Sequence, residues 1–163
     1  MKRFLISVAA VVVVALVAAA CGVATKTGTA TVGTRQIQGV GKVLVDGSGL
    51  ALYASDQETG GMVRCTGACN SFWRPVTVAN GSPSATSITG TLGVVNRPDG
   101  TRQVTYNGKL LYSFSLDQPG KVHGDNFADA FDGQKFTWHV VHDVTTAGSS
   151  GGAQSAGGVT RTY

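Results

Sequence analysis

Short runs of β-branched and aromatic residues, separated by turn-forming pairs, are the feature of this chain that most limits its fold. The strongest turn signal is Asn107-Gly108, which separates residues 102–106 from residues 109–114. Both residue types tolerate the positive φ angles of a two-residue hairpin. We therefore expect a β-hairpin around this pair.

Other segments follow the same pattern. Residues 40–45 and 50–54 predict a second hairpin, and residues 136–141 a closing strand. No long helical period is present, and the one helix we expect covers residues 66–73, before Pro75. The sequence thus predicts an all-β fold with one short helix.

A pattern in the first half of the chain recurs in the second half, which predicts an internal duplication. The expected architecture is two pseudo-equivalent antiparallel β repeats, packed as a small sandwich or barrel about a pseudo-twofold axis. A six-residue insertion in the second half accounts for a change in spacing. The matching pairs are Leu52 and Leu111, Tyr53 and Tyr112, and Glu58 and Asp117, each 59 residues apart, and Trp73 and Trp138, which are 65 apart.

Tyr112, Phe114 and Asp117 fit the pattern of a tyrosine, any residue, an aromatic residue, any two residues and an aspartate. On this motif and the text around it, residues 40–142 resemble the bacterial lipoproteins with a YxFWYxxD motif, also called the secreted repeat of unknown function. The resemblance implies a class and a location rather than a reaction. The first copy departs from the motif, because Ser55 stands at the aromatic place and Glu58 at the aspartate place.

The N-terminus reads as a secretory signal. Lys2 and Arg3 precede an apolar stretch over residues 4–20, which ends directly before Cys21. Small residues before a cysteine resemble the bacterial lipobox, although Ala18 stands where leucine is usual. The resemblance implies cleavage before Cys21 and a lipid anchor on it, at the extracytoplasmic face of the cell membrane. The alternatives are a soluble secreted protein and an uncleaved membrane anchor, but the stretch is shorter than the roughly 20 residues that span a bilayer.

These signals divide the chain into a signal peptide over residues 1–20, a flexible tether over 21–39, a duplicated domain over 40–143 and a low-complexity tail over 144–163. Without the signal, eleven Lys and Arg face nine Asp and Glu. No basic stripe appears, so we expect no nucleic-acid partner. No catalytic motif appears either, so we do not expect an enzyme.

Cys65 and Cys69 are the clearest local feature. Outside the cytoplasm, two cysteines at this spacing most simply form a structural disulfide, and the family resemblance implies cysteines at this place. The alternative is copper or thiol redox chemistry, in which thiolates would select copper(I) and Met62 and His123 would add ligands. No other cofactor is expected.

An acidic run with Asp125, Asp129 and Asp132 does not have the ligand spacing of an EF-hand. We expect a solvated loop there. Five aromatic residues are expected to fill the core rather than to form a ligand platform; they are Tyr53, Trp73, Tyr112, Phe114 and Trp138.

Taken together, the sequence predicts a membrane-anchored extracytoplasmic lipoprotein of unknown biochemical role. It would act as a binding or structural module of the cell envelope, for an unknown envelope protein or a small ligand. The alternative function is an extracytoplasmic copper-binding or thiol-redox protein using Cys65 and Cys69.

Overall fold

The computed structural model describes residues 31–144. The predicted signal peptide, Cys21, the first part of the tether and residues 145–163 of the tail lie outside this range. Within it, short strands dominate. They are β1 (Thr31–Ile37), β2 (Gly41–Asp46), β3 (Leu52–Ser55), β4 (Trp73–Pro75), β5 (Ser84–Ala85), β6 (Leu92–Asn96), β7 (Arg102–Tyr106), β8 (Lys109–Leu110), β9 (Tyr112–Phe114), β10 (Phe127–Phe131) and β11 (Gln134–Val140), with one helix, α1 (Cys69–Phe72).

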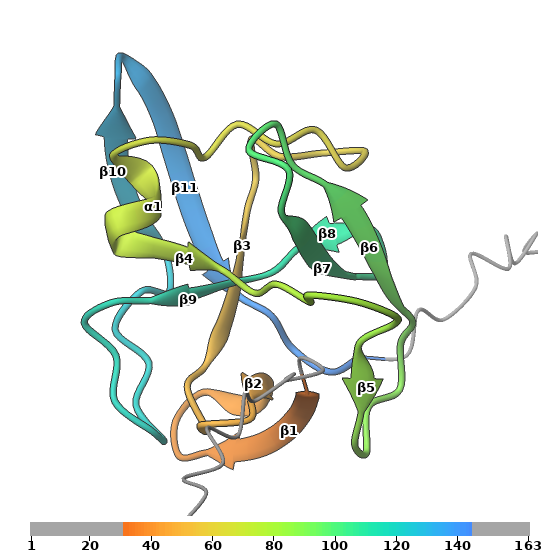
Figure 1. The fold of residues 1–163 in the computed structure, drawn as a ribbon. Helices are drawn as coiled ribbons and strands as arrows, with labels where there is room; N and C mark the ends of the chain where they lie inside the picture. Colours follow the sequence, from red (N-terminus) through yellow and green to blue (C-terminus); the bar gives the residue numbers. More distant parts are fainter. Residues whose placement is uncertain (1–30, 145–163) are drawn as a thin grey trace, which may run out of the picture.

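The strands form three sheets, one of which is central and is flanked by the other two (Figure 1). The central sheet has the order β10-β11-β3-β9-β4, and all its pairs are antiparallel. A sheet of order β2-β1-β5 lies at one end of β3, and a sheet of order β6-β7-β8 lies to one side. None of the three closes into a barrel. The all-β prediction is therefore confirmed at this level.

Successive side chains along the inner strands point to opposite faces, and both faces are buried. Tyr53 and Tyr112 enter one apolar cluster, which also holds both tryptophans as well as Cys65 and Cys69. Their neighbours Leu52 and Leu111 enter a second cluster on the other side. This explains why a leucine directly precedes each of these two tyrosines: β3 and β9 lie between the two clusters, so adjacent residues face different clusters.

The Asn107-Gly108 hairpin is confirmed. Asn107 and Gly108 have φ angles of 49° and 80°, and the flanking Tyr106 and Lys109 are paired. The returning segment then changes partners at Leu111. Its first part, β8, pairs with β7, whereas its second part, β9, joins the central sheet between β3 and β4.

The register of the central sheet follows the offsets seen in the sequence. Tyr53 pairs with Tyr112 at the centre. On one side Trp138 pairs with Ser55, and on the other side Trp73 pairs with Phe114. Each of these residues stands 59 or 65 positions from its counterpart in the other pair.

Four features differ from the sequence-based expectation. The second hairpin does not form a strand ladder, because β2 pairs with β1 over its whole length and pairs with the next segment only at the isolated bridge between Val45 and Ala51. Residues 31–37 of the predicted tether are strand β1, since Val32 and Ile37 bury their side chains in the core. Strand β5 pairs with β1 in parallel, so the sheets are not purely antiparallel. The predicted helix keeps only residues 69–72 as α-helix.

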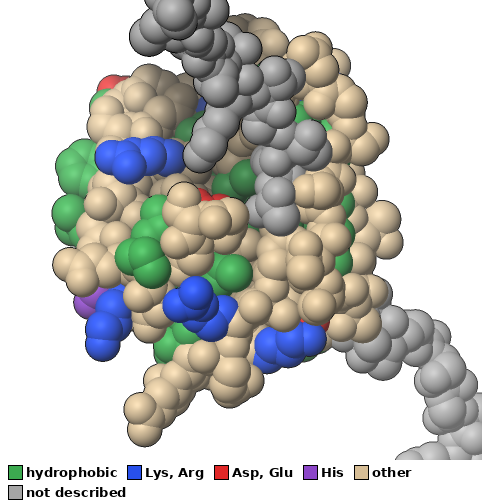
Figure 2. All heavy atoms as spheres, turned by 60° about the horizontal axis from the view of Figure 1, so that its bottom comes forward, with side chains coloured by type: hydrophobic (Ala, Val, Ile, Leu, Met, Phe, Trp, Pro, Cys, Tyr) green, Lys and Arg blue, Asp and Glu red, His purple; other side chains and the backbone are tan. Residues whose placement is uncertain are grey.

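The surface offers no continuous stripe of one charge on the face shown in Figure 2, where lysine and arginine side chains form separate patches. Within residues 31–144, no helix is both long enough and apolar enough to span a membrane.

Candidate functional site

The motif tyrosines and carboxylates form two hydrogen-bonded pairs, and each pair joins the first half of the chain to the second. The Tyr53 hydroxyl donates to Asp117 Oδ2 at 2.5 Å, and the Tyr112 hydroxyl donates to Glu58 Oε1 at 3.0 Å. Each tyrosine therefore binds the acid that follows the other tyrosine in the chain. Burial, together with the neighbouring carboxylate in each case, raises the pKa of both tyrosines well above its usual range.

The two carboxylates also hold the loops that follow them. Glu58 Oε1 accepts hydrogen bonds from the backbone N–H groups of Arg64 and Cys65, both at 2.7 Å. Asp117 Oδ1 accepts one from the N–H of His123 at 2.8 Å. Asp117 and the Oε1 atom of Glu58 therefore act here as structural acceptors, whereas the buried Oε2 of Glu58 has no hydrogen-bond partner among the residues described.

His123 is the one motif-associated group with an exposed ring. Its Nδ1 lies 3.2 Å from Asp117 Oδ1, and its side chain is 56% exposed. This places a carboxylate-oriented imidazole at the surface. Neither His123 nor Asp117 lines any of the three hollows found among the described residues.

The Cα atoms of Cys65 and Cys69 lie 5.3 Å apart and their sulfur atoms are joined, a separation that fits a disulfide. Both cysteines are buried, whereas Met62 is exposed. Among the residues that the structure describes, no group of three His, Cys, Asp or Glu side chains could hold a metal ion. The structure thus does not assemble the copper ligands proposed for Cys65, Cys69 and His123.

Asp129 is the clearest site residue that the sequence did not reveal. Instead of lying in a solvated loop, it belongs to β10 and accepts hydrogen bonds from the indole N–H groups of Trp73 and Trp138. The other predicted core aromatics, Tyr53, Tyr112 and Phe114, are also buried. They are core residues, as expected, and not a ligand platform.

Arg97 is a second residue that sequence patterns did not single out. Its guanidinium is buried and donates to Gln103, to the carbonyl oxygen of Cys65 and to Asn70 Oδ1. It also reaches the hydroxyl of Tyr112. A buried cation held by so many acceptors ties the disulfide loop to the β6–β7 hairpin.

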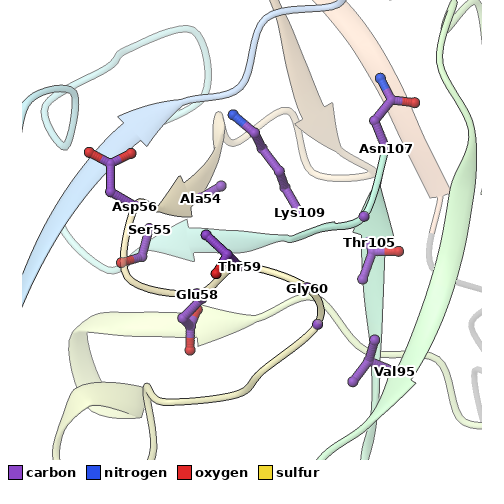
Figure 3. Close-up of a pocket in the computed structure, with 12 residues that line it drawn as sticks. Ala54, Ser55, Asp56, Glu58, Thr59, Gly60, Val95, Thr105, Asn107 and Lys109 are labelled. Atoms are coloured by element: carbon purple, nitrogen blue, oxygen red, sulfur yellow. The ribbon is translucent and has the colours of Figure 1, made fainter.

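One space with room for a ligand is a hollow of about 540 Å³. Figure 3 shows it between the loop after β3 on one side and β6, β7 and the Asn107-Gly108 turn on the other. We call it the β3–β7 hollow. Its lining includes Asp56, Thr59, Gly60, Gly61, Val95, Thr105 and Lys109.

The charged residues that line the β3–β7 hollow differ in the partners they have. Asp56 lies 3.1 Å from Nε2 of His139. Glu58 directs its hydrogen bonds to Arg64, Cys65 and Tyr112. The ammonium of Lys109, by contrast, makes no hydrogen bond or ion pair with any residue in the part of the chain described. It is the free charge of the site.

A second hollow of about 490 Å³ adjoins the first, since both are lined by Ala54, Asn107 and Lys109. Its remaining walls are mostly apolar, with Val140, Val141 and Val144 beside two histidines. Lys109 therefore stands between a polar and an apolar space.

Comparison with known families agrees with the motif. Residues 93–142 match the model of a family described as a secreted repeat of unknown function. This segment is similar to that repeat. The match agrees with the family resemblance seen in the sequence over residues 93–142. No curated protein and no solved structure gives a significant match.

The matched segment, residues 93–142, contributes one wall of the β3–β7 hollow, through Val95, Thr105 and Lys109. The opposite wall, residues 54–61, lies outside the matched segment. The hollow is therefore formed between the repeat and the preceding part of the chain.

Proposed function

We propose that this protein is a ligand-binding module held on the outer face of the cell membrane by lipid on Cys21. The β3–β7 hollow carries the binding part of the proposal. Its volume lies within the range typical of small-molecule sites, and Lys109 brings to it a charge without a partner. One wall belongs to β6, β7 and β8, which have a buried core behind them, and the other is the loop after β3.

The location rests on other observations. The N-terminal pattern ends at Cys21, and the matched family is one of secreted repeats. A disulfide between Cys65 and Cys69 suits an oxidising compartment. Two or more acyl chains are needed for stable anchoring, at about 0.8 kcal/mol per buried methylene.

We further propose that residues 33–77 are a diverged copy of the matched repeat, so that the hollow lies between two copies. Support comes from equivalent pairs of contacts. Tyr53 with Asp117 corresponds to Tyr112 with Glu58. The backbone agrees, because the N–H of Leu44 donates to Val141 as the N–H of Val104 donates to Val76.

Fractionation tests the anchor. Cys21→Ala should move the protein from the membrane fraction to the soluble extracytoplasmic fraction. If the variant stays with membranes to the same extent as the wild type, lipid on Cys21 does not hold it there.

Photo-crosslinking in intact cells tests the binding site. A photoreactive amino acid at Thr59, which lines the hollow, should give an adduct of a few hundred daltons by mass spectrometry. The control position is Gln36, an exposed residue of β1 that lines no hollow. Equal labelling at both positions, or none at Thr59, would contradict a ligand site in the hollow.

A further inference from the structure

The two outer sheets repeat each other pair by pair, with an offset of 60 residues. Val32 pairs with Asp46 at one end of the β1–β2 ladder, and at the same place in the β6–β7 ladder Leu92 pairs with Tyr106. The four pairs that follow in each ladder keep this offset. Strand β6 is therefore the counterpart of β1, and β7 is the counterpart of β2.

The outer edges of these two counterpart strands differ. The edge of β1 is covered by β5, which runs parallel to it and pairs Ala85 with Val32. The N–H of Thr86, directly after β5, also donates to the carbonyl oxygen of Val32 at 2.9 Å. Strand β6, in contrast, is the end strand of its sheet, and no strand within residues 31–144 lies on its outer side (Figure 1).

The outer edge of β6 presents backbone groups without partners. Residues along an antiparallel strand alternate between facing the paired strand and facing away from it. Arg97 faces its partner, because its N–H donates to the carbonyl oxygen of Thr101. Counting back from Arg97, the residues Leu92, Val94 and Asn96 turn their N–H and C=O groups outward, where no backbone group of residues 31–144 bonds to them. An apolar edge without charge or proline is a template for a further strand.

The path by which the chain reaches β5 recurs after β11. Before β5, the N–H of Val78 donates to the carbonyl oxygen of Arg102. After β11, the N–H of Asp143 donates to the carbonyl oxygen of Lys42, which is the counterpart of Arg102. The carboxylate of Asp143 then accepts hydrogen bonds from the N–H and the hydroxyl of Thr89, just before β6 begins. The chain that follows Asp143 therefore starts beside the entry to β6.

We infer that the chain beyond Val144 returns along β6 and adds a parallel strand to its outer edge, as β5 does on β1. The spacing of 65 residues between Val78 and Asp143 puts residues 149–151 in the place of residues 84–86. The N–H of Gly151 would then donate to the carbonyl oxygen of Leu92. The added strand would keep the apolar edge from pairing with other chains.

The composition of this segment suits such a strand. Both residues of β5, Ser84 and Ala85, are exposed, so backbone pairing rather than side-chain burial holds β5 on β1. Residues 149–151 are Ser-Ser-Gly, which likewise have little to bury. An extended segment of another chain could pair with the same edge, but the tail is covalently attached beside it and so has the higher effective concentration. The inference uses the equivalence of the two halves contained in the proposed function and needs no ligand in the β3–β7 hollow.

Amide hydrogen exchange tests the pairing in the full mature chain, extracted from membranes in detergent and labelled with nitrogen-15. The N–H of Leu92 faces outward, so only an added strand can protect it. We expect this N–H to exchange about tenfold more slowly in the wild type than in Gly151→Pro, which lacks the donor to Leu92. Gly158→Pro, seven residues further along the tail, is the matched control and should keep the slow exchange. Equal exchange of the Leu92 N–H in the wild type and in Gly151→Pro would overturn the inference.

A pair of introduced cysteines tests the register. Thr91→Cys combined with Ser149→Cys reproduces the positions of Thr31 and Ser84, which are paired in the other half. Paired residues on neighbouring strands lie about 4.8 Å apart, a separation that allows a disulfide. We expect this double variant to form the bond within one chain in most molecules. Thr91→Cys combined with Gly158→Cys is the control for chance encounters of the tail and should form much less of it.

The outcomes distinguish this inference from the proposed function. Equal yields of the two disulfides would mean that the tail meets β6 only by chance, and a disulfide between two chains would assign the edge to a second copy; either result overturns the inference. Unprotected Leu92 together with an adduct at Thr59 in cells would remove the added strand and leave the ligand site. Protected Leu92 without such an adduct would do the reverse.

Discussion

Trp73 and Trp138 stack face to face with ring centroids 4.0 Å apart and planes 11° apart, and both donate their indole N–H to the carboxylate of Asp129. The donor–acceptor distances are 2.6 Å for Trp73 and 3.0 Å for Trp138. The two rings come from β4, at one edge of the central sheet, and from β11, next to the strand at the other edge. One edge-strand carboxylate therefore fixes the two largest core side chains relative to each other.

Asp129→Asn should destabilise the fold, because an amide presents only one oxygen and turns a donor toward the second indole. We expect the free energy of unfolding to fall by about 1–3 kcal/mol, the usual cost of a hydrogen bond left unmade at a buried group. Urea denaturation followed by tryptophan fluorescence measures it. Asp132→Asn is the control: it removes the same charge at an exposed turn position, so its stability should match the wild type. Equal effects of the two changes would mean that charge alone, and not the indole contacts, matters.

The paired tyrosines give a second comparison. In Tyr53→Phe, Asp117 Oδ2 loses the tyrosine hydroxyl and the N–H of Gly124 loses its acceptor. In Tyr112→Phe, Glu58 Oε1 keeps its two backbone donors. Tyr53→Phe should therefore cost more stability, by about 1 kcal/mol, since it leaves buried polar groups unpaired. Thermal unfolding of the two variants compares them directly, and a larger loss for Tyr112→Phe would refute the argument.

Local chemistry was enough to predict some of this fold. The Asn107-Gly108 hairpin depends on φ angles that few residues tolerate, so the dipeptide alone reveals it. The Leu-Tyr pairs identified core strands for a similar reason, because adjacent residues of a strand face opposite sides. Pairing between distant strands was not predictable in this way: a turn at residues 46–49 looks the same whether β3 folds back on β2 or continues into another sheet.

Acid should destabilise the protein through Asp143. Burial alone would raise the pKa of Asp143, but hydrogen bonds from Lys42, the Thr89 N–H and hydroxyl, and Tyr106 outweigh it and hold this pKa well below its usual range. The folded state therefore binds this proton less readily than the unfolded state. The resulting stability is present above about pH 4 and is lost as the pH falls below it.

Asp143→Asn should flatten this acid dependence. Stability measured by urea denaturation between neutral and acidic pH should fall less steeply in the variant than in the wild type. Asp132→Asn, which makes no such contacts, should keep the steep wild-type profile. Identical profiles for Asp143→Asn and the wild type would show that another group governs the acid response.

The candidate site was harder to foresee than the core. Lys109 and Thr59 are ordinary surface residues in the sequence, and no local pattern shows that the loop after β3 and the Asn107-Gly108 turn together line one hollow. The acids near Asp129 in the sequence predict a solvated loop rather than a strand with buried partners. Its two indole partners lie 56 and 9 residues away, and no local pattern encodes that convergence.

The disulfide provides the last test, which also separates a structural role from redox chemistry. Cys65 and Cys69 are four residues apart, and the chain-entropy model gives about 2 kcal/mol for so short a loop. Replacing both cysteines by alanine should lower the free energy of unfolding by about that amount while the fold is kept, because Arg97 and Glu58 still hold the loop backbone. Under native conditions the buried bond should react slowly with a mild reductant, at a rate limited by opening of the loop. Rapid reduction in the folded protein, followed by reoxidation without loss of structure, would instead favour a thiol-redox function.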